Sequence, residues 1–134
     1  MNRDCIKKNM SEYEFLTLFV SAATMLEKDP VVNGEDLETK LYNYSQDSNY
    51  RFLFENFLHD REEKKVDLKE GFDYCYSFGI LVKSEDKNIS IINITDNEAK
   101  QIIGKSNLFD VKAMYELCED YYSNKKQNKA MIKK

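Results

Sequence analysis

The chain has 134 residues and a net charge of −4, which is the size and charge of one ordinary domain. Hydrophobic residues make up 42% of it, so the composition argues against a disordered chain. Its three cysteines are far apart and show no CxxC spacing, which argues against a disulfide framework. No apolar run reaches the roughly 20 residues of a membrane helix, and the first ten residues lack the apolar segment of a secretory signal. We therefore expect a cytoplasmic protein without a membrane partner.

The charge is unevenly distributed along the chain. Residues 123–134, SNKKQNKAMIKK, contain five lysines and no acidic residue. The 122 residues before them carry 15 basic and 24 acidic side chains, a net charge of −9. A lysine-rich segment can attract phosphate or an acidic partner, or it can be a solvated chain end. We expect residues 1–10 and 124–134 to be flexible, and residues 11–123 to form a single domain.

The first predicted element is a helix over 12–28. Ser11 and Glu14 have the spacing of a capping box, and apolar residues follow at helical spacing. The pair Asp29-Pro30 ends the helix, because the residue before a proline disfavours helical backbone. The apolar face of this helix is broad, so we expect it at the centre of the core. A dimer interface is the alternative use of the same face.

Two further helices are predicted before the middle of the chain. A turn at 31–34 leads into the second helix, whose apolar residues recur at i, i+4 and i+7. A connector at 46–49 precedes the third helix, 50–58, which is unusually aromatic. We expect its rings in the core; exposed rings would instead suggest a partner surface. A charged connector over 60–65 follows.

The stretch 66–95 is predicted to be a short helix followed by a two-stranded hairpin. Asp67 can cap the helix, and a glutamate stands three residues after it. Gly79 supplies the permissive backbone that ends such a helix. The β-branched runs 80–83 and 89–95 flank a polar turn and predict the two strands.

Two helices are predicted after the hairpin. Thr95 and Glu98 form a second capping box, and the helix that they open runs to Gly104. The last helix is predicted over 107–123. The expected fold class is mainly α with one small β-hairpin, about six helices in the order ααααββαα.

The order of elements over about residues 66–104 resembles a winged-helix domain. Its parts are a helix, Gly-Ile-Leu-Val, a charged turn, an isoleucine-rich strand and a Thr-Asp-Asn-Glu helix start. The resemblance implies a helix-turn-helix pair formed by 50–58 and 67–78, with 80–95 as the wing.

A recognition helix of such a domain would place its early side chains against DNA. The exposed positions of helix 67–78 hold three acids and one lysine, and no Arg, Asn or Gln occurs in it. We therefore expect this helix to read DNA poorly. Lysines of the hairpin and the C-terminal segment are better placed for phosphate. The candidate phosphate contacts are Lys83, Lys87, Lys125, Lys126 and Lys129.

Residues that could support catalysis are few and scattered. His59 is the only histidine, and no spacing joins it to a cysteine as a nucleophile–base pair or a metal site. Neither GxGxxG nor GxxxxGK occurs, and the adjacent acids lie on predicted solvent faces. We expect no enzyme activity, no metal and no cofactor.

Two functions of different classes fit these observations. The first is a small non-catalytic regulatory or adaptor module that binds another protein, because the chain is acidic and rich in tyrosine. The second is a DNA-binding transcriptional regulator, as a homodimer, that contacts phosphates through the wing and the lysine-rich segment. A third reading is that the acidic surface mimics nucleic acid and occupies a basic groove of a partner. The candidate partner-facing aromatic residues are Tyr74, Tyr121 and Tyr122.

Overall fold

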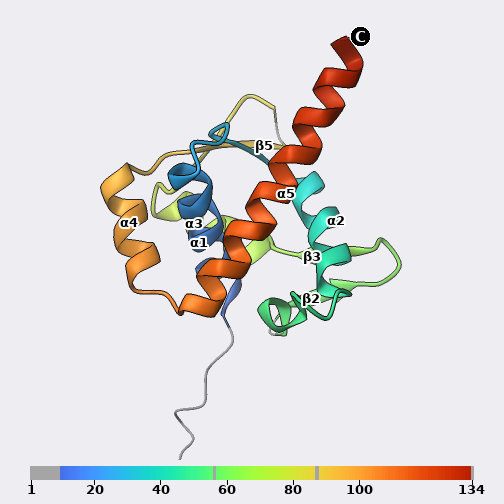
Figure 1. Cartoon of the computed structure of the whole chain (residues 1–134), viewed down its shortest axis with the longest axis horizontal. Helices are drawn as coiled ribbons and strands as arrows, with labels where there is room; N and C mark the ends of the chain where they lie inside the picture. The colour runs from blue at the N-terminus through green and yellow to red at the C-terminus, as the bar shows by residue number, and fades with distance from the viewer. Residues whose placement is uncertain (1–9, 56, 87, 134) are drawn as a thin grey trace, which may run out of the picture.

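The computed structural model describes residues 10–55, 57–86 and 88–133 (Figure 1). This part of the chain is a mixed α+β fold of five α-helices, one 3-10 helix and five short strands in two small sheets. The elements are, in chain order, α1 (Glu12–Met25), β1 (Val31–Asn33), α2 (Gly34–Ser45), η1 (Arg51–Phe54), β2 (Leu58–Asp60), β3 (Lys65–Asp67), α3 (Lys69–Ser77), β4 (Leu81–Lys83), β5 (Ile89–Ile92), α4 (Asp96–Gly104) and α5 (Leu108–Lys133).

Helix α1 is the centre of the fold. It contacts α3, α4 and α5, and Figure 1 shows it surrounded by them. Every residue from 15 to 23 is buried, so its broad apolar face is used inside the chain. The predicted capping box is present, because Ser11 Oγ accepts from the Glu14 amide at 3.1 Å and Glu14 Oε1 accepts from the Ser11 amide at 2.9 Å. The predicted central position is confirmed.

The end of α1 comes earlier than the sequence predicts. Its last helical residue is Met25, and Glu27 has left-handed backbone with φ +58°. The Lys28 amide donates to the Ala23 carbonyl at 2.9 Å, as in a Schellman turn. The chain therefore ends the helix by bonding back to one of the helix's own carbonyls. This end lies three residues before residue 28, where the proline predicts it.

Strand β1 replaces the turn predicted at 31–34. It pairs antiparallel with β5, and Val32 lies opposite Ser90. Strand β4 pairs with the other edge of β5, which gives the sheet order β1-β5-β4. The predicted hairpin is therefore present, and β1, from earlier in the chain, adds a third strand to it.

The segment 50–67 differs most from its prediction. The expected aromatic helix is wrong: the segment forms one 3-10 turn, η1, and then the two-stranded sheet β2-β3. The rings of Phe54 and Phe57 both lie 5.3 Å from the Phe15 ring, centroid to centroid. These contacts with α1 override the helical spacing of the aromatic residues. The predicted pairing of 50–58 with the next helix as a helix-turn-helix is wrong for the same reason.

The last two helices follow their local signals. The Thr95–Glu98 capping box is present, and α4 ends at Gly104 as predicted. Asn107 Oδ1 accepts from the Phe109 amide at 2.8 Å and so opens α5. Backbone helix continues to Lys133 through the segment predicted as a flexible tail, because this stretch contains neither glycine nor proline. Figure 1 shows the C-terminal part of α5 extending beyond the other elements.

The flexible segment predicted over 1–10 lies, except for Met10, outside the described residues. None of the helices in the described part has the length and hydropathy to cross a membrane.

Candidate functional site

Gly71 allows α3 to lie unusually close to α1. A Cβ atom on this glycine would be 2.9 Å from the Cβ of Glu12 and 2.9 Å from a methyl group of Leu16. Only glycine fits such a distance without movement of the neighbouring helix. The Gly71 amide also donates to Glu12 Oε1 at 3.1 Å. Packing and a hydrogen bond together hold α3 against the start of α1.

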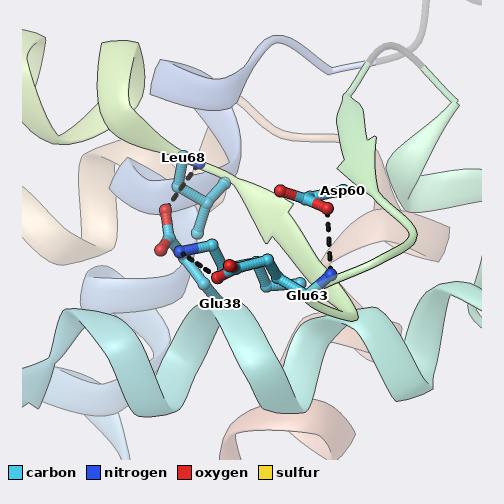
Figure 2. Close-up of polar contacts among 5 residues, drawn as sticks. Glu38, Asp60, Glu63 and Leu68 are labelled. Carbon is cyan, nitrogen blue, oxygen red and sulfur yellow. Dashed lines mark hydrogen bonds and ion pairs between the residues drawn. The ribbon is translucent and has the colours of Figure 1, made fainter.

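A second carboxylate, which belongs to α2, also holds the start of α3 in place. The amide of Leu68, the N-cap residue, donates to Glu38 Oε2 at 2.9 Å (Figure 2). Leu68 has an apolar side chain, which cannot cap the helix. The carboxylates of Glu12 and Glu38 therefore accept from amides at the start of α3 that would otherwise lack a partner. Asp67, the predicted cap, accepts from the Lys69 amide at 3.0 Å instead.

Both glutamates ionise less readily than ordinary carboxyls. Burial raises the pKa of Glu12 and of Glu38 above the usual value of 4.5. The amide hydrogen bonds lower each pKa but do not cancel the effect of burial. Nearby carboxylates, including Asp67, raise both pKa values further. The start of α3 is therefore a partly buried region in which several carboxyls lie close together.

The β2-β3 hairpin beside this region is closed by its own polar contacts. The Glu63 amide donates to Asp60 Oδ1 at 3.0 Å, a contact drawn in Figure 2. The carboxylate of Glu63 also forms an ion pair with Lys65 at 3.6 Å. These contacts fix the strand that leads directly into α3.

Three aromatic rings gather where α1 and α3 meet the solvent. The Tyr13 ring lies 5.7 Å from the Tyr74 ring and 5.7 Å from the Phe78 ring, between centroids. Tyr74 and Phe78 are four residues apart, so both lie on one side of α3. They are 55% and 67% exposed. We call Tyr13, Tyr74 and Phe78 the aromatic surface.

A groove of about 630 Å³ adjoins the aromatic surface. It lies between the start of α1, helix α3 and the loop from α4 to α5, and Tyr13 and Tyr74 belong to both features. Leu108 and Phe109 follow directly after the lining residues of that loop and are 83% and 75% exposed. The charged residues that line the groove are Glu12, Glu14, Glu70, Lys105 and Asp110.

Of the three predicted partner-facing aromatics, Tyr74 is exposed and the other two are in the core. Tyr121 and Tyr122 are 0% and 3% exposed, and their rings lie 5.7 Å and 6.3 Å from the ring of Phe19. The Tyr122 hydroxyl donates to the Val31 carbonyl at 3.1 Å. Burial raises the pKa of Tyr121 to about 12 and raises that of Tyr122 as well. The prediction for these two residues is wrong because their side of α5 faces α1.

Only one of the predicted phosphate contacts can be placed. Lys83 is exposed on β4, and its ammonium lies 4.9 Å from the centroid of the Tyr76 ring, a cation–π contact. Lys87 lies outside the described residues, and of Lys125, Lys126 and Lys129 only the backbone is described.

The described residues include the candidate chemical groups of His59, Cys75 and Cys118. In this part of the chain there is no group of three or more His, Cys, Asp or Glu side chains that could hold a metal ion. Burial raises the pKa of Cys75 to about 11 and that of Cys118 higher still. Both thiols therefore stay protonated at neutral pH and are weak nucleophiles. The His59 ring packs against Tyr42, 6.3 Å between centroids.

Sequence reasoning missed Phe78 and Phe109 as surface residues. Each is a large apolar residue outside the stripe of its helix, and Phe78 stands directly before the glycine that ends α3. A large apolar residue outside the apolar stripe of its helix is the signal that could have identified both as exposed.

The chain matches no family model, no curated protein and no solved structure.

Proposed function

We propose that the chain is a small non-catalytic adaptor or regulatory module, which binds another protein through the aromatic surface and the adjoining groove. The observation that carries the proposal is the exposure of Tyr74 and Phe78, which pack on Tyr13 and lie beside the groove. Aromatic residues are enriched at the centres of protein interfaces. Covering the exposed part of each ring would contribute about 1–2 kcal/mol to binding.

The backbone under this surface is held in place before any partner binds. Gly71 packs directly on α1, and the carboxylates of Glu12 and Glu38 fix the first amides of α3. A surface that is already ordered loses less conformational entropy on binding. This supports a binding role for α3 more than a role as a mobile lid.

Site-specific photo-crosslinking tests the proposal. The full chain would carry p-benzoylphenylalanine in place of Phe78 or of Phe109, and a control chain would carry it in place of Thr39, which is exposed on α2. We expect one defined crosslinked protein from the first two positions in a lysate of the source cells, and none from the control. A product that contains a second copy of the chain would identify the partner as a homodimer subunit.

The proposal fails if position 39 gives the same products as positions 78 and 109. It fails equally if no position gives a product. Replacement of Tyr74 by Ala should weaken the crosslink at Phe78, because it removes the neighbouring ring without touching the crosslinking position.

DNA binding is the second candidate function. Lys83 favours it, because this exposed lysine lies on the hairpin that the winged-helix resemblance assigns as the wing. Glu70 and Asp73 are exposed on α3 and weigh against entry of that helix into a DNA groove. These two carboxylates therefore favour the protein-binding function over DNA binding.

A further inference from the structure

We infer that the segment of the partner that occupies the groove is cationic and amphipathic: its apolar side chains cover the aromatic surface and its Lys or Arg side chains meet the carboxylates of the groove. The inference rests on the proposed function and names the chemistry of the partner.

The charge of the groove is the first argument. Four carboxylates and one ammonium line it, a net charge of −3. Within the described part of the chain, none of the ion pairs involves Glu12, Glu14 or Glu70. Amide hydrogen bonds occupy one oxygen each of Glu12 and Glu14 and leave the other oxygen of each carboxylate for a partner cation. A partner cation would therefore meet Glu12, Glu14 and Glu70, which form no ion pair within the described residues.

The pKa of Glu12 agrees with this picture. Burial raises it, and the carboxylates of Asp67, Glu70 and Glu38 raise it further. A carboxyl in such surroundings experiences a negative potential, which a nearby positive charge would relieve.

The apolar neighbours of the groove are the second argument. Tyr13 and Tyr74 line it and also belong to the aromatic surface, so one bound segment would contact rings and carboxylates together. Ring faces also attract cations, as the contact of Lys83 with Tyr76 shows elsewhere in this chain. Leu108 and Phe109 offer apolar contacts on the α5 side. A purely polar cationic segment would leave these side chains uncovered.

The charge of the chain before its lysine-rich segment is the third argument. Residues 1–122 carry a net charge of −9, which attracts cationic partners over long range and repels anionic ones. A segment with alternating lysine and leucine fits both the local and the overall charge.

Two synthetic amphipathic peptides with the same leucine pattern test the inference. One has lysine at its polar positions, and the other has glutamate. We would measure their binding to the full chain by fluorescence anisotropy, at low and at physiological salt. We expect the lysine peptide to bind about tenfold or more tightly than the glutamate peptide, with weaker binding at higher salt.

Two double variants with the same change in net charge distinguish binding at the groove from attraction to the overall charge of the chain. Glu14→Gln with Glu70→Gln removes two groove carboxylates, and glutamine at 14 can still complete the capping box. Glu35→Gln with Glu85→Gln removes two exposed carboxylates outside the groove. We expect the first pair to weaken binding of the lysine peptide about fivefold and the second pair to weaken it less than about twofold. Thermal unfolding of each variant checks that it is folded.

The inference is overturned if the two peptides bind equally, if neither binds, or if the two double variants behave alike. A partner crosslinked at Phe78 together with indistinguishable double variants would leave the proposed function standing and remove the cationic chemistry. A groove-specific loss without any crosslinked protein would support the cationic chemistry and remove the proposed adaptor function.

Discussion

Gly71 sets the distance between α1 and α3 and thereby the position of Tyr74 beside Tyr13. Replacement by alanine would place a Cβ 2.9 Å from Glu12 Cβ and 3.0 Å from the Glu12 backbone carbon, which cannot move aside as a flexible side chain would. We predict that Gly71→Ala lowers the free energy of unfolding by about 1–3 kcal/mol. Urea unfolding followed by circular dichroism measures the change.

Gly104→Ala is the matched control for that substitution. Gly104 is the last residue of α4, and an added Cβ would meet no atom within 4 Å. Alanine favours helix more than glycine, so we expect no loss of stability, or a small gain. Equal losses for the two variants would contradict the packing role assigned to Gly71.

Glu27 carries a backbone conformation that suits glycine better than glutamate. Its φ of +58° lies in the left-handed region, directly after the C-cap of α1. We predict that Glu27→Gly raises the free energy of unfolding by about 0.5–1 kcal/mol, because glycine adopts this conformation without steric cost. Glu27→Ala keeps the Cβ and should change stability little. A gain of the same size for alanine would show that removal of the charge is responsible.

At the scale of elements, α3 is the helix whose position depends most on distant residues. Glu12 and Glu38 accept from its Gly71 and Leu68 amides, and burial raises the pKa of both carboxyls above 4.5. A raised folded-state pKa means that the folded protein binds these protons more tightly than the unfolded chain. The stability that these groups contribute is therefore full below the unfolded pKa and is lost as the pH rises through the folded pKa.

The double variant Glu12→Gln with Glu38→Gln tests this dependence of stability on pH. The wild type should gain stability relative to the variant as the pH falls from about 7 to about 4.5, because glutamine cannot take up the proton. Chemical unfolding of both proteins at several pH values gives this difference, and other carboxyls largely cancel in it. If the wild type instead loses stability relative to the variant as the pH falls, the amide hydrogen bonds outweigh burial in setting the two pKa values.

Local signals predicted those elements whose ends are set by neighbouring residues. The Ser11–Glu14 and Thr95–Glu98 capping boxes and Gly79, with φ +74°, mark helix ends that the structure confirms. The segment 50–67 was not predictable in this way, because packing on Phe15 sets its backbone. Strand β1 likewise depends on its pairing with β5, which lies almost sixty residues later.

The candidate site was predictable only in part, for a related reason. Helical spacing shows which residues share a face, but it does not show which element covers that face. Tyr121 and Tyr122 therefore could not be separated from Tyr74 as surface residues, although α1 buries the first two. The groove joins α1, α3 and the α4–α5 loop, which no local pattern brings together.

At the scale of the whole molecule, the separation of charge distinguishes the two candidate functions. The five lysines of residues 123–134 follow 122 residues of net charge −9, so we expect most of the phosphate attraction at that end. We predict that the full chain binds random duplex DNA only weakly and only at low salt, and that a chain truncated after residue 122 does not bind it. Fluorescence anisotropy at low and physiological salt measures both, with thermal unfolding as the check that the truncated chain is folded. DNA binding with a steep salt dependence that survives the truncation would place the site on the hairpin around Lys83, and DNA binding would then replace protein binding as the leading function.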